Sequence, residues 1–507
     1  MVPATACKWK ARQQKLTSSE WIDPKFHRYV LTKQLKDKNT TYKLDVAVFQ
    51  EYMREKHRIL KIGDLIMRYS GKCYEVMDED AIKKLCGEEL YDLDYRRLFE
   101  KSHYEKFDHF IRTDPRANPD SAIAREHQMR YLTMENGLFD LHEEKLINHT
   151  PELITTNLLP YPYDPSAKCP RWERYTTEVF LDSRGNIDKT LILLVQEVGG
   201  YCLHKGMPVA SMFFLVGEGE NGKSVFIKTL INVFGQHNTC TVSLKNIEKD
   251  HYVIKLVDKM VNVSTETTRK LLETENLKAA TDGDQLTGKG LYRNPTEFTP
   301  FAKHFFAMNQ RPQIDDPTHG FWRRLYMIPF LATFPPGKCE PDLGEKLAAP
   351  KSQGGYEELP GIFNWFLEGY RRLKANNFIF SVPEHLDREK EAYREECNSA
   401  LEYINWELTV TGKEENVMLW KDVRAKYRWF CEQGGLVEEQ LKVLRGTIQS
   451  KGVRVDKDKD GMTKAFGVRL ATEHEKAYRH APPADSCPSD EEVGKLPDGA
   501  NLDAYSF

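Results

Sequence analysis

The middle of the chain switches between two hydrophobic periods, and the switch predicts a strand, a loop and a helix in succession. Residues 211–216 (SMFFLV) form an apolar run of strand length, and residues 223–235 place apolar side chains at helical spacing. The apolar run 191–203 predicts a helix before this unit, and the runs 303–308 and 325–330 predict further strands. Strands that alternate with helices favour an α/β fold with a parallel sheet and flanking helices.

The N-terminal region has a weaker and mixed pattern. Residues 1–116 combine helical spacing with short strand candidates at 65–70 and 72–76, which predicts an α+β region of unassigned role. The acidic triplet 78–80 (DED) could be a two-metal site of a polymerase or primase. We prefer its interpretation as the first turn of a helix, where carboxylates are favoured, and we expect no primase site in this region.

The C-terminal third predicts two helices followed by a β-hairpin. One helix face carries Trp420, Val423, Tyr427 and Phe430, and the next carries Leu441, Leu444 and Ile448. Two strand candidates, 452–456 and 463–470, then flank the turn DKDKDG. This order is typical of a winged helix-turn-helix, which binds either DNA or a protein partner. The candidate DNA contacts in it are Lys442, Arg445 and Lys451.

These patterns divide the chain into six predicted segments. They are an N-terminal α+β region, a helical linker, an α/β core, a helical lid, a winged helix and a tail. The tail is rich in Pro, Asp and Ser from about Glu473 onward, and we expect it to be disordered. The predicted bounds, in order, are 1–116, 117–205, 206–335, 336–398, 399–471 and 472–507.

Composition narrows the class of protein. A chain of 507 residues with 40% hydrophobic and 29% charged residues is typical of a globular protein of roughly three domains. No apolar run reaches the roughly 20 residues of a membrane helix, so we expect a cytoplasmic protein without a membrane partner. The net charge of −3 confines any nucleic-acid contact to a local surface. The ten scattered cysteines include no C-x-x-C pair and indicate neither disulfides nor zinc.

The loop between the first strand and its helix has the spacing of a phosphate-binding loop. Residues 217–224 (GEGENGKS) fit the pattern G-x-x-x-x-G-K-[ST] in the expected strand–helix context. The glycines let successive N–H groups and the helix N-terminus converge on phosphate oxygens. Lys223 is expected to reach the β- and γ-phosphates of ATP, and Ser224 to bind Mg²⁺. The predicted cofactor-binding residues are Gly217, Glu218, Gly219, Glu220, Asn221, Gly222, Lys223 and Ser224.

A later strand candidate ends in an acid. Residues 260–266 (MVNVSTE) are rich in β-formers and end at Glu266. In a P-loop ATPase a strand beside the loop strand delivers a carboxylate to the metal or to the attacking water, because phosphoryl transfer needs both held in line. We therefore predict that Glu266 is catalytic, binds Mg²⁺ with Ser224, and lies on the strand next to the loop strand.

The sequence resembles a known helicase family. Residues 135–180 (ENGLFDLHEEKLINHTPELITTNLLPYPYDPSAKCPRWERYTTEVF) look like the linker that precedes the helicase in primase-helicases of phages, plasmids and poxviruses, a superfamily 3 branch of the AAA+ ATPases. The resemblance covers about residues 135–470. It implies that Asn309 is a sensor of the γ-phosphate, and that Arg323 or Arg324 reaches the ATP of a neighbouring subunit, with Arg323 the better candidate.

The segment 288–294 (GKGLYRN) is a basic and aromatic tip flanked by glycine. By resemblance it is the hairpin that projects into the channel of the ring. Lys289 and Arg293 can pair with DNA phosphates, and Tyr292 can stack on a base or sugar. A solvated surface loop is the alternative interpretation.

These features predict an ATP-dependent, ring-forming DNA helicase or translocase of a phage, plasmid or other mobile element. The resemblance implies a hexamer that binds Mg-ATP between subunits, acts on single-stranded or forked DNA, and works with a separate primase or polymerase. One alternative is a replication initiator in which ATP drives assembly and origin melting. A P-loop kinase or metabolic ATPase is another, although it has no use for the hairpin and the winged helix.

Overall fold

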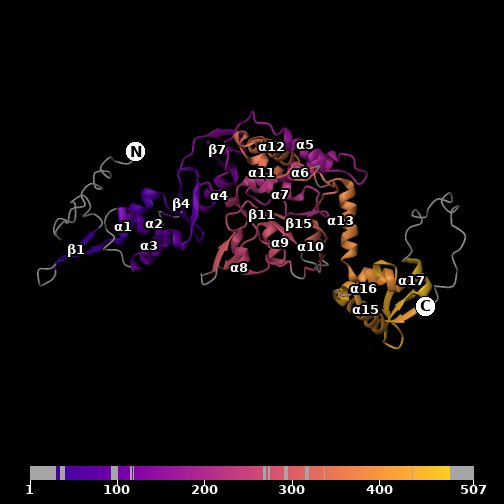
Figure 1. Ribbon diagram of the computed structural model, residues 1–507. Helices are drawn as coiled ribbons and strands as arrows, with labels where there is room; N and C mark the ends of the chain where they lie inside the picture. Colours follow the sequence, from indigo (N-terminus) through magenta and orange to yellow (C-terminus); the bar gives the residue numbers. More distant parts are fainter. Residues whose placement is uncertain are drawn as a thin grey trace. The chain divides into compact units, whose positions relative to one another are not determined.

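A computed structural model of the chain describes residues 30–34, 40–92, 101–114, 117, 119–266, 270–271, 274–289, 295–314, 319–335, 337, 339–434, 436 and 438–479. The chain divides into two compact units, Met1–Lys390 and Glu391–Phe507, each with a hydrophobic core of its own (Figure 1). Within the described residues no helix is both long enough and apolar enough to cross a membrane.

The first part of the larger unit is a mixed α+β region, as the sequence predicts. Helix α2 begins at Glu79, and the Asp78 carboxylate accepts a hydrogen bond from the backbone N–H of Ala81 (2.9 Å). The acidic triplet is therefore a helix start, which confirms the structural interpretation. The elements are β1 (Val30–Gln34), β2 (Thr40–Leu44), α1 (Val46–His57), β3 (Leu60–Ile62), β4 (Leu65–Tyr69), β5 (Tyr74–Met77), α2 (Glu79–Asp92) and α3 (Lys101–Thr113).

The linker, residues 117–205, is helical only in part. The sequence predicts a helical segment, and this prediction is incomplete. Three short strands form an antiparallel sheet after its first helix. Strands of three or four residues are too short to show a clear two-residue period in the sequence, which explains why they were missed. The elements are α4 (Ser121–Arg130), β6 (Tyr131–Met134), β7 (Gly137–Asp140), β8 (Lys145–Ile147), α5 (Pro170–Val179) and α6 (Lys189–Leu203).

A five-stranded parallel sheet forms the centre of the larger unit and confirms the predicted α/β class. Its strands lie in the order β10 (Thr239–Cys240), β11 (Val261–Glu266), β15 (Lys303–Met308), β9 (Met212–Val216) and β17 (Leu325–Pro329). Four of these strands match the apolar runs of the sequence. They are buried along most of their length, which is expected when both faces of a parallel sheet are covered.

Alternating side chains of the sheet meet helices on both faces. On one face Phe305 packs edge-on against Phe226 of α7 (6.4 Å between ring centroids). On the other face Phe214 packs against Phe321 of α10 (6.3 Å). The helices and small strand pairs of this part are α7 (Lys223–Phe234), η5 (Gln236–Asn238), α8 (Asp250–Val253), η6 (Ile254–Leu256), α9 (Glu275–Asp282), α10 (His319–Arg324), β12 (Lys270–Leu271) with β16 (Gln313–Ile314), and β13 (Leu286–Lys289) with β14 (Pro295–Phe298).

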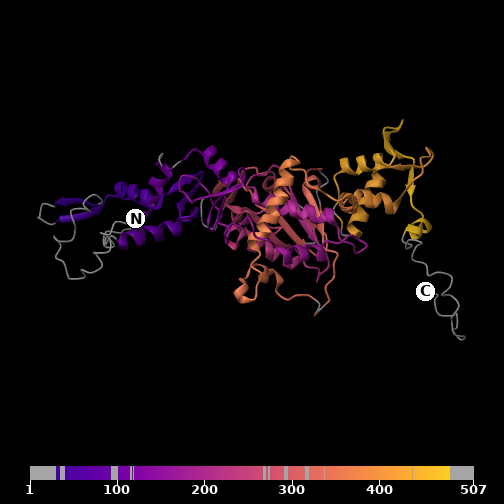
Figure 2. The same ribbon diagram turned by 90° about the horizontal axis from the view of Figure 1, so that it is seen from above.

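The predicted lid is helical, and its longest helix packs closely on α6. A Cβ atom added at Gly200 would lie 2.3 Å from the backbone N of Tyr370, and one added at Gly369 would lie 2.0 Å from the Gln196 carbonyl oxygen. Glycine at these positions therefore lets the two helix backbones approach each other. Figure 2 shows the orange α12 against the magenta core. The elements are α11 (Leu343–Ala348), η7 (Lys351–Gln353), α12 (Leu359–Ala375) and α13 (Glu384–Glu396).

The smaller unit has the predicted helix, helix and hairpin. The predicted core residues Val423, Tyr427, Leu444 and Ile448 are buried, whereas Leu441 is 38% exposed. Its elements are α14 (Ser399–Glu407), β18 (Leu408–Val410), β19 (Val417–Leu419), α15 (Trp420–Gly434), α16 (Leu441–Ser450), β20 (Arg454–Lys457), β21 (Thr463–Phe466), β22 (Val468–Leu470) and α17 (Glu473–Arg479).

The expected disorder from Glu473 onward is wrong for the first residues of the tail. Residues 473–479 form α17, which is held to the unit by two ion pairs: Glu475 accepts hydrogen bonds from Arg469 (2.7 Å), and Lys476 contacts Glu407 (2.8 Å). These contacts join α17 to the end of α14 and to β22, and they outweigh the polar composition of the segment. The rest of the predicted tail, from residue 480, lies outside the described residues.

Candidate nucleotide-binding site

The ends of four parallel strands are in register at one edge of the sheet. Glu266 pairs with Met308, Met308 pairs with Val216, and Val216 pairs with Pro329. The phosphate-binding loop therefore starts level with the acid at the end of β11 and with Asn309, which follows β15 and is exposed. In open α/β sheets, ligands bind at this carboxyl edge. The fold brings together the loop, the acid and the asparagine that the sequence singled out.

The predicted place of Glu266 beside the loop strand is wrong by one strand. β15, which ends before Asn309, lies directly between β9 and β11. The backbone of Glu266 is thus two strand spacings, about 9–10 Å, from the loop strand. The neighbour of the loop strand carries the asparagine, because the order of parallel strands follows from their crossover connections and not from their order in the chain.

The loop backbone turns through positive φ angles at three positions. Gly219, Glu220 and Gly222 have positive φ angles of 144°, 46° and 90°. Gly222 is the N-cap of α7 and supplies no side-chain hydrogen bond to the first turn. The N–H of Lys223 contacts Oδ1 of Asn221 (3.4 Å), and the dipole of α7 favours negative charge at this end of the helix.

The Lys223 ammonium group lies inside the loop. The residue as a whole is 8% exposed. Its Nζ donates hydrogen bonds to the carbonyl oxygen of Gly217 and to Oδ1 of Asn221 (3.3 Å), both of which are neutral acceptors. Burial lowers the pKa of Lys223 because desolvation disfavours its charged form. A phosphate group is the partner that this cation fits best.

The chain after β17 covers the loop from a second side. Asn221 donates a side-chain hydrogen bond to the Phe330 carbonyl (3.3 Å), and the Phe334 N–H donates to the Glu220 carbonyl (2.8 Å). A Cβ atom added at Gly217 would lie 2.5 Å from the Phe330 oxygen, so this position needs glycine. Asn221 thus supports both the loop and the lysine.

The residues fit Mg-ATP as the ligand of this edge. Ser224 is exposed in the first turn of α7, one residue after the buried lysine. Mg²⁺ keeps several waters and takes one or two protein oxygens together with phosphate oxygens. Ser224 and the acid at the end of β11 are the candidate protein ligands. Among the described residues no group of three His, Cys, Asp or Glu side chains is placed to bind a metal ion by itself.

The two arginines before β17 lie at the opposite edge of the sheet. Arg324 ends α10, and Leu325 begins β17. The five-residue strand separates them from the phosphate loop by about 13 Å of rise. Arg324 is 5% exposed and pairs with Asp282 of α9 (Nε to Oδ1, 3.0 Å), whereas Arg323 is exposed. Arg324 thus has a structural ion pair within its own chain, and Arg323 is exposed.

The predicted hairpin is present as the antiparallel strands β13 and β14. A Cβ atom at Gly288 would lie 2.8 Å from the Cα of Ile254, so β13 is held closely against η6. Lys289 is exposed at the end of β13. Tyr292 and Arg293, the other predicted DNA contacts, lie outside the described residues.

Comparisons with known proteins find family models and relatives that match parts of this chain. The family described as "D5 N terminal like" matches residues 47–181, and a family of unknown function (DUF5906) matches residues 215–324. A protein of Acanthamoeba polyphaga mimivirus named as a helicase is 23% identical over 66% of this chain and 36% of its own length. A protein of African swine fever virus named as a primase is 24% identical over 59% of this chain and 33% of its own length. The chain is thus similar to viral proteins named as helicases and primases.

The chain spans about a third of the length of the curated relatives it matches. Among solved structures, the apo C-terminal region of NrS-1 is similar at 12% identity over 83% of this chain and 98% of that chain, with a TM-score of 0.42.

Sequence reasoning missed one residue at the candidate nucleotide site. Tyr175 of α5 lies in the predicted linker, 47 positions before Gly222, and donates a hydrogen bond to the Gly222 carbonyl (3.0 Å). Apolar spacing in α5 predicts that Tyr175 is buried, but no local signal indicates what its hydroxyl group contacts.

Proposed function

We propose that this chain is an ATP-driven DNA helicase or translocase that assembles as a ring. One observation carries the proposal: the glycine-rich loop 217–224, Glu266 and Asn309 lie in register at the carboxyl edge of one parallel sheet. Phosphoryl transfer needs a phosphate cradle, a metal ligand and a group that orients water, and these three occupy one edge. The relatives named as helicases and primases support a role in DNA replication.

In this proposal Lys223 contacts the β- and γ-phosphates, and Ser224 with Glu266 holds Mg²⁺. Asn309 orients the attacking water or senses the γ-phosphate. Arg323 completes the site of the adjacent subunit, because it is exposed at the far edge of its own sheet and so cannot reach its own loop. A hexameric ring satisfies this geometry. Lys289 at the hairpin contacts the phosphates of single-stranded DNA.

The test is hydrolysis of Mg-ATP with and without single-stranded DNA, together with unwinding of a forked duplex. A helicase hydrolyses ATP faster when DNA is present and separates the fork. Hydrolysis without stimulation would point to a P-loop kinase or metabolic ATPase. Melting of an origin-like duplex without continued unwinding would point to the initiator alternative.

A further inference from the structure

Helix α5 is outside the strand–loop–helix unit, yet it is packed against the phosphate-binding loop. A Cβ atom added at Gly222 would lie 2.8 Å from Cγ2 of Val179 and 3.4 Å from Cε2 of Tyr175. A side chain at position 222 would therefore clash with α5. The positive φ angle at this position also favours glycine. Glycine at this position of the loop backbone thus allows α5 to pack directly against the loop.

The Tyr175 hydroxyl adds a directed contact to this packing. It donates to the Gly222 carbonyl (3.0 Å), which also accepts hydrogen bonds from the N–H groups of Val225 (3.0 Å) and Phe226 (3.1 Å). This carbonyl is the first acceptor of α7. The hydroxyl thus anchors the peptide that joins the loop to the helix and orients the N–H groups that follow.

Tyr175 is well suited to hold a fixed position. It is 2% exposed, and its ring stacks on Trp172 (5.0 Å), which in turn stacks on Phe226 of α7 (6.1 Å). Burial raises the pKa of Tyr175 well above its ordinary value, so the hydroxyl stays protonated and remains a donor.

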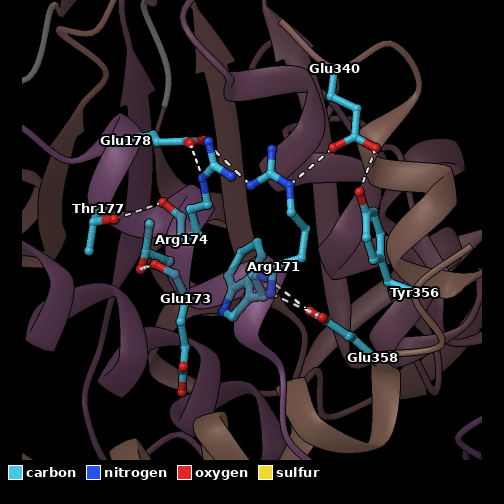
Figure 3. A network of polar contacts seen from close by, with 10 residues as sticks. Arg171, Glu173, Arg174, Thr177, Glu178, Glu340, Tyr356 and Glu358 are labelled. Atoms are coloured by element: carbon cyan, nitrogen blue, oxygen red, sulfur yellow. Dashed lines mark hydrogen bonds and ion pairs between the residues drawn. The ribbon is translucent and has the colours of Figure 1, made fainter.

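The other end of α5 is fixed by the chain that follows β17 (Figure 3). The Glu358 carboxylate accepts hydrogen bonds from the backbone N–H groups of Arg171 (3.0 Å) and Trp172 (2.9 Å) and so caps the helix. The Arg171 side chain pairs with Glu340 (3.1 Å), which also accepts a hydrogen bond from the Tyr356 hydroxyl (2.8 Å).

Burial alone would raise the pKa of Glu340, but the hydrogen bonds from Tyr356 and Arg171 lower it. The carboxylate is therefore charged at neutral pH and keeps the pairing with Arg171. The segment before Glu340 also contains Phe334, whose N–H contacts the loop at Glu220 (2.8 Å). The loop is consequently held from two sides, and the two supports are joined through Arg171 and Glu340.

We propose that Tyr175 is a positioning residue of the nucleotide site, through which helix α5 of the linker sets the start of α7 and the affinity for ATP. This inference rests on the proposed function of the loop. It predicts that the loss of one hydroxyl group, with the aromatic ring retained, weakens nucleotide binding more than it weakens the fold.

The experiment compares Tyr175→Phe with Tyr201→Phe in the full chain. Tyr201 is a matched control because it is equally buried in the same core and its hydroxyl donates to a backbone carbonyl, that of Val209 (2.5 Å), ahead of the amino end of β9. Binding of a fluorescent ATP analogue, the KM and kcat of hydrolysis, and the unfolding temperature are measured for both variants. Lys223→Ala is included as the variant without a phosphate contact.

We expect Tyr175→Phe to raise Kd and KM for ATP by about 3- to 10-fold, the range for loss of one hydrogen bond, with kcat within about twofold. Tyr201→Phe should lower the unfolding temperature to a similar extent and leave Kd unchanged. Equal Kd values for the two variants would overturn the role of Tyr175 while the site itself stands. Failure of the wild-type protein to bind ATP, or normal binding and hydrolysis by Lys223→Ala, would instead overturn the proposed function.

Discussion

At the scale of single residues, the buried ammonium group of Lys223 is the clearest candidate for a contact with phosphate. Its charge is buried among neutral oxygens of Gly217 and Asn221, and burial lowers its pKa. A cation held in this way gains an anionic partner when a phosphate enters the loop. The interactions that orient it are already formed, so little reorganisation is needed when a nucleotide binds.

We predict that Lys223→Ala reduces ATP hydrolysis by on the order of 10²-fold or more, because the developing charge on the phosphates loses its side-chain partner. Lys228→Ala is the matched control. Lys228 lies on the same helix but is exposed and pairs with Glu345 of α11, so its loss should leave turnover near the wild-type rate. Steady-state hydrolysis, with circular dichroism to establish folding, checks the pair. Normal turnover by a folded Lys223→Ala protein would contradict the assignment of the loop.

At the scale of elements, contacts between side chains decide how helices and hairpins are held. Glu89 of α2 joins that helix to α1: its carboxylate accepts hydrogen bonds from Tyr52 (2.9 Å) and Lys56 (2.6 Å) and contacts His57 (3.0 Å). Burial by itself would raise the pKa of Glu89, but the hydrogen bonds from His57, Lys56 and Tyr52 lower it to about 2.

Because the pKa of Glu89 is lower in the folded state, its stabilising contribution is complete above its ordinary value of 4.5 and is lost as the pH falls toward 2. We predict that hydrogen exchange in α1 and α2, corrected for its intrinsic pH dependence, becomes faster between pH 4.5 and pH 2. Glu89→Gln should exchange fast already at pH 6. Glu88→Gln, at the exposed neighbouring position, should behave as the wild-type protein. Equal protection in the two variants would show that the cluster does not stabilise this region.

The hairpin β13–β14 is the element that we assign to DNA. We predict that Lys289→Ala combined with Arg293→Ala weakens binding of single-stranded DNA and lowers the slope of log affinity against log salt by roughly one to two units. Basal hydrolysis should persist, since neither residue belongs to the phosphate-binding loop. A control that replaces Lys189 and Lys351, two exposed lysines outside the hairpin, should keep the wild-type slope. An unchanged slope in the hairpin variant would favour a solvated loop.

At the scale of the whole molecule, the positions of the two arginines support the proposal that a second copy of the chain completes the site. Arg324 is held by Asp282, and Arg323 is exposed at the sheet edge opposite the phosphate loop. An arginine that stabilises the charge of a transferring phosphoryl group contributes roughly 10³ to 10⁵ in rate in related enzymes. Arg323 can supply this contribution only to a neighbour.

We predict that Arg323→Ala and Lys223→Ala proteins are each inactive and that mixing them under conditions of subunit exchange restores part of the ATP hydrolysis. Hybrid interfaces then combine an intact loop from one subunit with an intact arginine from the other. Mixing Lys223→Ala with an Arg323→Ala, Lys223→Ala double variant is the control and should restore nothing. Hydrolysis at the wild-type rate by Arg323→Ala alone, or no recovery in an exchanging mixture, would contradict action between subunits.

The sequence by itself determined the features that depend on neighbouring residues. The loop 217–224, the strand 303–308 and the helix at 191–203 are visible because strand and helix periods are local, and because a phosphate cradle needs a contiguous backbone. The acidic turn at 78–80 was predictable for the same reason. Short strands such as β6–β8 were not, since a few residues show too little of their period.

Only the tertiary structure decided the features that depend on residues far apart in the chain. It placed β15 between β9 and β11, so that Asn309 and not Glu266 follows the strand beside the loop. It paired Arg324 with Asp282, 42 positions away, a contact that separates Arg324 from the exposed Arg323 beside it. It also brought Tyr175 to Gly222. Such contacts follow from strand order and from the packing of helices on a sheet, which are properties of the whole core and leave no local pattern in the sequence.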